Sequence, residues 1–375
     1  MPKTIVMLMD GTGQQFQNNE TNIVRLLRLL PPDQPERQIA FYGPGVGTRG
    51  APTLTPFGGE WRALAGGLAL GAGIYERVAD AYRYLAQHWV HGDRIHFYGF
   101  SRGAFAVRAL AGLVAQVGLM GAGFDNQIPY AIRLYASFPI GGDKAAQDAH
   151  AQLVRRFGET FGCRFPDIAF IGLFDTVKSV FSFDRLAGQD IRVSLAGTYA
   201  NPRVKVVRHA MAIDERRAFF RTNKWRASNP ALAGGTDVRQ VWFAGCHGDV
   251  GGGVPETESG LSAITLQWML KEAVAHGLLI DPGHSSAAFG QPTPDVLQPA
   301  HDSLTGFWKA LEWLPTNPRR GPDSGDRAGW RFPRGRPRQI TLPALVHQSV
   351  VDKLTLDRSY RPPNLPISGY GVEPW

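Results

Sequence analysis

The chain has 375 residues, enough for one large α/β domain with insertions or for two domains. Its 43% hydrophobic and 19% charged residues are ordinary for a globular protein. The formal net charge of +8 favours anionic partners. The basic residues are scattered, however, except for one run at 319–338, which we interpret as a solvated face, and we expect no nucleic-acid partner. Two cysteines exclude a disulfide framework and show no metal-ligand spacing, so we expect neither metal nor cofactor.

The N-terminus predicts no targeting segment. Residues 1–10 hold one lysine and a five-residue apolar run ended by an acid, which is too short for a signal peptide and is typical of a first strand. The longest weakly polar stretch, residues 63–75, is too short to span a bilayer. We therefore expect cytoplasmic synthesis, which is compatible with later export in folded form.

Short apolar runs alternate with amphipathic segments along the chain. Strands are predicted at residues 3–9, 38–42, 95–98, 168–173, 204–211 and 238–244, and helices at 21–30, 75–90, 102–114 and 260–276. Residues 62–74 are glycine-rich and predict a loop or frayed helix. The alternation indicates an α/β fold with a doubly wound, mostly parallel sheet.

The same pattern divides the chain into regions. We expect one α/β domain over residues 1–280, with a helical cap insertion at about 119–165. Residues 281–375 are rich in proline, glycine and arginine, which predicts an irregular C-terminal wrap or lid packed on the same domain.

A strand, the pentapeptide Gly99-Phe100-Ser101-Arg102-Gly103 and a helix follow one another directly. This context predicts a nucleophile elbow, in which a sharp strand-to-helix turn exposes the serine. Glycine two residues to either side avoids a collision with the neighbouring chain. The helix that follows would direct its N-terminal amides at the serine, where an oxyanion would form. The alternative is an ordinary turn that contains a serine.

A serine nucleophile needs a base and an acid, which on this fold follow it in the order Asp/Glu and then His, each after a strand. Asp175 directly follows a predicted strand, and His247 follows another and precedes a glycine loop. We therefore predict the catalytic set Ser101, Asp175 and His247. Asp175 could instead be a helix N-cap, and Asp184, Asp214 and Asp249 are rival acids.

Further residues are assigned around this set. One oxyanion-hole donor is expected to be the amide of Arg102, and a second to come from the loop after the first strand, Gly11 or Thr12. The Arg102 side chain could meet a substrate phosphate or carboxylate, or form a surface salt bridge. Substrate contacts are also expected from Gly248, Asp249 and Asp10, of which Asp10 could instead hold the first loop open or touch a metal.

Several segments taken together resemble one known family. They are Asp10-Gly11-Thr12, residues 45–48, Gly92-Asp93, residues 99–104, 173–177, 208–210, 213–217 and 241–253. The family is the α/β-hydrolase-like domain that includes the catalytic domain of type VI secretion lipase effectors of the first class. The likeness runs from the N-terminus to about residue 276. Gly248, where the family more often has serine, and Phe174, where tryptophan is common, depart from the pattern without removing a catalytic group.

The resemblance implies a serine hydrolase whose nucleophile and base fall on Ser101 and His247, with the acid placed at Asp175. For effector members it implies phospholipase A activity on membrane lipids of competitor cells, with peripheral membrane contact and an immunity protein as partner. Two other hypotheses remain open at this point. One is a non-catalytic binding or structural protein on the same fold, and the other is a metal-assisted phosphate ester hydrolase that uses Asp10.

Overall fold

A computed structural model describes residues 2–11, 19–45, 67–140, 142–177, 197–226, 235–281, 283, 292–315 and 332–375. An eight-stranded sheet runs through this part of the chain, in the order β2-β1-β3-β4-β5-β6-β7-β8. Every neighbouring pair is parallel. The strands are β1 (Thr4–Met9), β2 (Gln38–Gly43), β3 (Arg94–Phe100), β4 (Ile168–Phe174), β5 (Val204–Ala212), β6 (Asp237–Phe243), β7 (Leu345–His347) and β8 (Gly371–Glu373).

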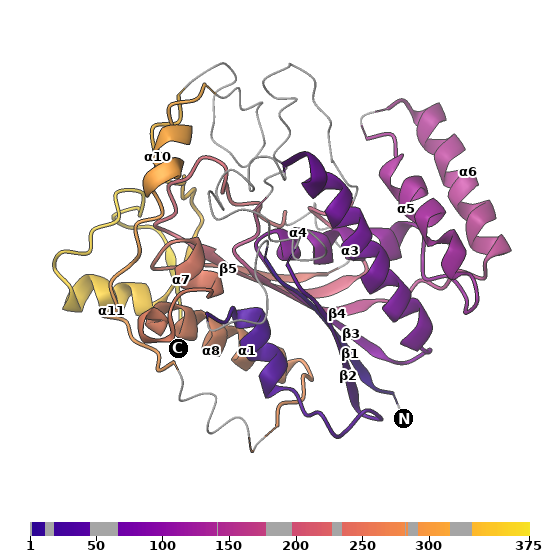
Figure 1. The fold of residues 1–375 in the computed structure, drawn as a ribbon, viewed down its shortest axis with the longest axis horizontal. Coiled ribbons are helices and arrows are strands. Elements are labelled where there is room, and N and C mark those ends of the chain that lie inside the picture. The colour runs from indigo at the N-terminus through magenta and orange to yellow at the C-terminus, as the bar shows by residue number, and fades with distance from the viewer. Residues whose placement is uncertain are drawn as a thin grey trace, which may run out of the picture.

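Helices cover both faces of the sheet, which gives three layers (Figure 1). The helices of the described residues are α1 (Asn22–Leu29), α3 (Gly67–His88), α4 (Arg102–Gln116), α5 (Ile128–Ala136), α6 (Lys144–Thr160), α7 (His247–Gly251), α8 (Gly260–Ala275), α10 (Gly306–Leu311) and α11 (Gln348–Leu356), with short 3₁₀ turns at Asp125–Gln127 and Glu256–Glu258. The predicted α/β class with a parallel, doubly wound sheet is confirmed.

Two hydrophobic cores lie on opposite faces of the sheet because the side chains of each strand alternate. In β1, Ile5 and Met7 pack with α3, α4 and α5, whereas Val6 and Leu8 pack with α1 and α8. All six residues of β1 are buried. Burial on both faces is the usual state of a parallel strand, which explains why its sequence is a continuous apolar run and not an alternating one.

The chain winds in both directions from β1. β2 pairs with one side of β1 and β3 with the other. Ligands of open parallel sheets bind outside the carboxyl ends of the strands at such a switch point. Residues 10–11 leave β1 there, and Ser101 leaves β3 beside them. The topology therefore brings the first loop and the serine elbow to the same place.

Several elements differ from the sequence prediction. α3 begins at Gly67, inside the glycine-rich stretch, and so is longer than predicted. The region expected to be a helical cap contains α5 and α6; α5 packs against α3 and α4, and Figure 1 shows α6 beyond α5, on the opposite side of the molecule from α10 and α11. Its role as a cap stays a prediction.

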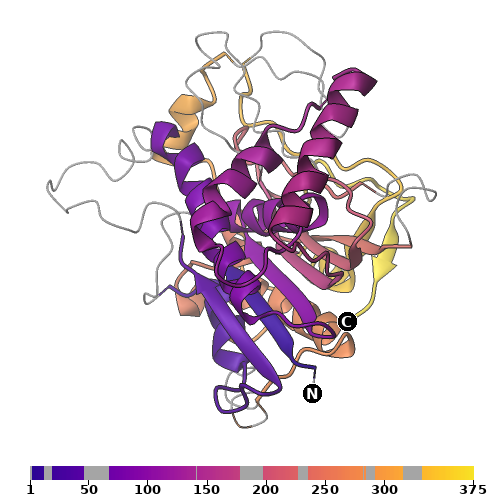
Figure 2. The ribbon, with the colours of Figure 1, turned by 90° about the vertical axis from the view of Figure 1, so that its right-hand side faces the viewer.

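The C-terminal region is more regular than its composition indicates. It adds β7 and β8 to the sheet, and α11 lies between these two strands in the sequence. Figure 2 shows the C-terminal strand at one edge of the sheet, with the N-terminal strands at the other. The tail therefore belongs to the same sheet as the first 280 residues, while its role as a lid stays a prediction.

The packing of the elbow glycines generates a stability prediction. A Cβ on Gly103 would lie 2.2 Å from the Met9 carbonyl oxygen and 2.5 Å from the Asp10 carbonyl oxygen. Because both atoms are backbone, the variant Gly103→Ala must displace β1 from α4, and we expect a loss of about 2–4 kcal/mol in the free energy of unfolding. Urea denaturation followed by circular dichroism measures it.

Gly158→Ala is the matched control. Gly158 lies in α6, and its added Cβ would meet nothing nearer than Cys163 Cβ at 3.7 Å. Alanine is the better helix former, so this variant should be as stable as wild type or more stable by about 1 kcal/mol at most. Equal stability of the two variants would contradict the close contact described at Gly103.

Candidate active site

The backbone of Ser101 is strained as a nucleophile elbow requires. Ser101 has φ 57° and ψ −120°, a conformation that non-glycine residues rarely adopt. It is the N-cap residue of α4, but its hydroxyl does not cap the helix. Its N–H donates instead to the Phe174 carbonyl at the end of β4 (3.1 Å). The side chain is therefore presented at the start of α4 without being used by the helix.

The two elbow glycines explain how this turn fits. A Cβ on Gly99 would lie 2.5 Å from Ala104 Cα, and one on Gly103 would strike β1 as described above. The first amides of α4 have no carbonyl partner within the helix, so they face the region around Ser101 with the positive end of the helix dipole. Arg102, the first residue of α4, carries one of them.

The acid and the base meet through a short hydrogen bond. His247 Nδ1 and Asp175 Oδ2 are 2.6 Å apart, although 72 positions separate them in the sequence. Both side chains are buried. Asp175 leaves the end of β4 with φ 39°, and His247 begins α7 after β6. The carboxyl ends of β4 and β6, which β5 separates in the same parallel sheet, thus bring the two residues together.

Aromatic rings hold the imidazole in place. The Phe100 ring lies 4.7 Å from the His247 ring, and the Phe220 ring lies edge-on to it at 4.9 Å. Phe100 is the residue before Ser101, so the base lies beside the elbow. The contacts of the described residues include no hydrogen bond between the Ser101 hydroxyl and His247.

Asp175 accepts hydrogen bonds through both of its carboxylate oxygens. Its Oδ1 accepts from the Ala212 N–H (3.1 Å) and from Arg338 (2.6 Å), and its Oδ2 accepts from Arg338 (2.8 Å) as well as from His247. Burial by itself would raise the pKa of Asp175, but the charge of Arg338 and the hydrogen bonds from His247 and Arg338 bring this pKa far below its usual range. The carboxylate is therefore ionised throughout the neutral range.

The protonation of His247 follows from burial. Loss of solvent lowers the pKa of His247 below its usual value, and the hydrogen bond and charge of Asp175, which act in the opposite direction, offset this only in part. At neutral pH the imidazole is uncharged and able to accept a proton. Its backbone N–H donates to Glu215 Oε2 (3.2 Å), a second buried carboxylate that is paired with Arg217.

Two of the rival acids lie elsewhere. Asp214 accepts from the Gly245 N–H (2.7 Å) and the Tyr360 hydroxyl (2.9 Å), which places it behind the loop that precedes α7. Asp249 accepts from the Cys246 N–H (2.8 Å) and from the His301 backbone and ring. Neither touches the His247 ring. Asp184, the third rival, lies outside the described residues, as does Thr12 of the expected oxyanion hole.

The first loop contacts the elbow, but its amide is already engaged. A Cβ on Gly11 would lie 3.3 Å from Ser101 Cβ, so Gly11 borders the serine. The Gly11 N–H donates to Asp10 Oδ1 (2.7 Å), while Asp10 Oδ2 accepts from Thr21 (2.8 Å) and Tyr42 (3.0 Å). Asp10 is thus a loop-holding residue in this structure, and burial raises its pKa.

Sequence reasoning missed Arg338 and Glu215. The run at 319–338 is interpreted above as a solvated face, and this is wrong for its last residue, because Arg338 is buried on Asp175. The rest of the run up to residue 331 lies outside the described residues. No local signal was available, because an arginine within a proline-rich tail does not indicate a partner 163 positions earlier in the sequence.

Within the described ranges, no group of three or more His, Cys, Asp and Glu side chains could hold a metal ion. No helix in that same part of the chain is long and apolar enough to cross a membrane.

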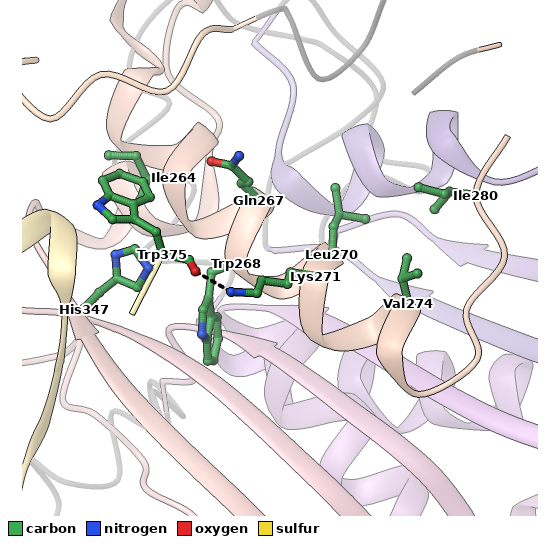
Figure 3. A pocket seen from close by; sticks show the side chains of 9 residues that line it. All are labelled: Ile264, Gln267, Trp268, Leu270, Lys271, Val274, Ile280, His347 and Trp375. Atoms are coloured by element: carbon green, nitrogen blue, oxygen red, sulfur yellow. Dashed lines mark hydrogen bonds between the residues drawn. The ribbon is translucent and has the colours of Figure 1, made fainter. Parts of the chain in front are cut away.

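A cavity of about 440 Å³ lies along α8, away from the acid and the base (Figure 3). Trp268 and Val274 of α8, His347 and Trp375 are among its lining residues. Lys271, also on α8, donates to the backbone oxygen of Trp375 at its edge. No residue of the elbow or of the Asp175–His247 pair lines it.

A parallel doubly wound sheet with a strained serine elbow at its switch point defines an α/β-hydrolase-like protein. The chain matches the family model of the T6SS phospholipase effector Tle1-like catalytic domain over residues 3–272. It belongs to that family, as the sequence motifs indicate.

Individual relatives cover the chain only in part. An uncharacterised protein of Saccharomyces cerevisiae is 31% identical over 228 residues, which are 58% of this chain and 32% of the yeast protein. The chain therefore spans about a third of the length of that relative.

Solved structures give weaker likenesses. An uncharacterised protein from Pseudomonas aeruginosa matches with a TM-score of 0.41 and 19% identity, over 77% of this chain and 48% of that one. The Tle1 effector bound to the VgrG spike from the type 6 secretion system matches with a TM-score of 0.35 and 20% identity, over 69% of this chain and 52% of that one. A carboxylesterase-like protein from Lactobacillus plantarum WCFS1 matches with a TM-score of 0.35 and 14% identity, over 74% of this chain and 88% of that one.

The contacts of Asp249 generate a second stability prediction. Replacement by alanine removes the acceptor of the Cys246 and His301 amides and of the His301 ring. Because the buried Cys246 N–H, just before His247, and the half-buried His301 donors would be left unpaired, Asp249→Ala should lose about 2–4 kcal/mol of unfolding free energy in urea denaturation.

The exposed Asp148 of α6 provides the control, and Asp148→Ala should stay within about 0.5 kcal/mol of wild type. If Asp249→Ala were as stable as wild type and changed only KM for an ester, Asp249 would bind substrate, as the sequence suggests, and would not support the loop.

Proposed function

We propose that the chain is a serine carboxylic ester hydrolase of the lipase or phospholipase A type. The observation that carries this proposal is the 2.6 Å contact between His247 Nδ1 and Asp175, placed next to a serine with φ 57° at the start of a helix. A buried Asp–His pair fixes the imidazole tautomer that leaves Nε2 free to accept a proton. The strained elbow presents the hydroxyl group that would give up that proton.

In the acylation step, Ser101 Oγ attacks the ester carbonyl carbon while His247 Nε2 takes the hydroxyl proton. The tetrahedral intermediate then expels the alcohol, which for a phospholipid is the lysophospholipid, and His247 returns the proton to this leaving oxygen. Asp175 stays ionised and stabilises the imidazolium between the two transfers, which agrees with its lowered pKa. For this step the Ser101 hydroxyl must turn toward His247, and such catalytic hydrogen bonds often tighten only around substrate.

Deacylation uses the same groups with water in place of the alcohol. His247 removes a proton from water, the hydroxide attacks the acyl carbon, and Ser101 leaves with the proton returned by His247. The products are the fatty acid and the free serine. The lowered pKa of His247 favours the neutral imidazole that must start both half-reactions.

The oxyanion of each intermediate would be stabilised by amides at the start of α4. The Arg102 N–H is the first donor, because it follows the nucleophile and has no partner within the helix. The second donor must come from the loop after β1. The Gly11 N–H would have to break its hydrogen bond to Asp10 Oδ1 before it could donate to the oxyanion, so Thr12 stays an equal candidate. One such donor is typically worth about 10²–10³ in turnover.

Family membership supports a lipid substrate. The matched family is the Tle1-like catalytic domain of type VI secretion phospholipase effectors. The matched residues, 3–272, include Ser101, Asp175 and His247. We infer that the substrate is a phospholipid or a related lipid ester at a membrane surface, where a net charge of +8 favours anionic headgroups. Delivery by a type VI system and a cognate immunity protein are parts of the same proposal.

Labelling and turnover of point variants test the proposal. A fluorophosphonate probe should label the wild-type protein, and peptide mapping should place the label on Ser101. Ser101→Ala and His247→Ala should lose labelling and reduce hydrolysis of phospholipid vesicles and p-nitrophenyl butyrate by about 10⁴-fold or more, because the residues of a triad act as one unit.

Ser137→Ala is the control, since Ser137 is an exposed serine at the end of α5. It should label and turn over as wild type does. Folded wild-type protein that neither reacts with the probe nor hydrolyses either ester would refute the proposed function.

A further inference from the structure

Arg338 contacts the proposed catalytic acid through both oxygens. Its two terminal nitrogens lie 2.6 Å and 2.8 Å from Asp175 Oδ1 and Oδ2, and both side chains are buried. This parallel fork is the geometry in which a guanidinium binds a carboxylate most selectively. The remaining donors go to backbone carbonyls, with Ala212 accepting at 3.0 Å and Phe220 accepting two of the bonds. All five guanidinium N–H groups are therefore used.

The position of Arg338 makes it more than an ion-pair partner. The carbonyl of Phe220 is one of its acceptors, and the Phe220 ring lies against the His247 imidazole. Asn364 donates to the Arg338 carbonyl (3.0 Å) and to the Ile213 carbonyl (2.9 Å), which ties this part of the tail to the loop after β5. One side chain thus holds the carboxylate, the end of β5 and one wall of the imidazole site.

Arg338 also lies outside residues 3–272, the part of the chain that matches the family model. It belongs to the proline-rich region after the long helix α8. We propose that Arg338 is a positioning residue of the active site: it fixes the Asp175 carboxylate for His247 and sets the pH at which His247 becomes a base. This inference rests on the proposed function, because it assumes that His247 is the base.

The charges around the pair determine the direction of the effect. Asp175 and Glu215 are the buried anions near His247, and Arg338 and Arg217 are the buried or half-buried cations that face them. Removal of Arg338 leaves Asp175 without a compensating charge, so a proton bound to the pair, on His247 or on Asp175 itself, becomes more favourable. The proton affinity of the His–Asp pair should therefore rise.

Three other groups packed here do not titrate near neutral pH. His209 of β5 accepts a hydrogen bond from the Thr176 N–H, and burial lowers its pKa to about 3. Burial raises the pKa of the Cys246 thiol far above neutral. Burial would raise the pKa of Glu215, but Arg217 brings it below its usual value. His301 titrates closer to neutral, because burial lowers its pKa but its hydrogen bonds to Glu258 and Asp249 raise this pKa above its usual value. Only a shift of the pH profile that Arg338→Met produces and Arg208→Met does not is therefore attributed to the His247–Asp175 pair.

The experiment compares kcat/KM for p-nitrophenyl butyrate against pH in wild type, Arg338→Met and Arg338→Lys, each normalised by fluorophosphonate titration of active sites. Wild type should lose activity only below about pH 6.5, since burial keeps His247 neutral there. Arg338→Met should move this acidic limb upward by about 0.5 pH unit or more and reduce turnover about 10–100-fold. Arg338→Lys keeps the charge but not the two parallel hydrogen bonds. It should therefore leave the acidic limb at its wild-type pH and retain only part of the turnover.

Arg208→Met is the matched control. Arg208 is a buried arginine of β5 that pairs with Glu272 and Asp237, neither of which touches His247. It should lower the melting temperature without moving the limb. The same outcome for Arg338→Met, a lower melting temperature with wild-type limb and turnover per titrated site, would overturn the inference.

If Arg338→Met does not fold, Arg338→Lys still tests the inference. Unchanged turnover per titrated site would overturn it, whereas reduced turnover with the acidic limb at its wild-type pH would support it. Failure of the proposed function is separate, since it would show as a wild-type protein that does not react with the probe.

Discussion

The buried ion pair between Arg338 and Asp175 is the interaction on which the proposed site depends. A carboxylate without solvent would normally take up a proton, and Asp175 would then stop orienting and stabilising the imidazole. The guanidinium keeps it ionised and uses one lone pair of each oxygen, which leaves Oδ2 able to accept from His247 at 2.6 Å. Breaking such a pair leaves a buried uncompensated charge, so the tail is bound to the sheet by the same contact that prepares the acid.

The rest of the geometry follows from the parallel sheet. Three consecutive strands of the sheet order end at the site: β1 with Asp10 and Gly11, β3 with Ser101, and β4 with Asp175. β6 ends nearby and is followed by His247. Because parallel strands share one carboxyl edge, residues far apart in the sequence converge without long loops. The glycines of the elbow let β1 and α4 approach closely enough for the serine turn to fit between them.

Local sequence patterns were sufficient for the central part of this arrangement. Each of the first six strands contains a short apolar or aromatic run, and Ser101, Asp175 and His247 stand directly after or close to three of them, so both fold class and candidate triad could be predicted. β7 and β8 have three residues each and are ordered by pairing with the sheet, which no local pattern reports. Arg338 was missed for the same reason, because its burial depends on a carboxylate 163 positions away. The Gly11 amide shows a related limit: the sequence allowed Asp10 to hold this loop, which the hydrogen bond from the Gly11 N–H to Asp10 agrees with, but it did not show that the bond would engage an amide expected in the oxyanion hole.

A crystal structure of the protein after reaction with a long-chain alkyl fluorophosphonate tests the central claim most directly. The account predicts a covalent bond from Ser101 Oγ to phosphorus, the phosphonyl oxygen within hydrogen-bond distance of the Arg102 amide, and His247 Nε2 turned to the phosphonate with Nδ1 still on Asp175. A phosphonate bound to another residue, or a His247 ring that leaves Asp175 and faces away from Ser101 in the adduct, would contradict it.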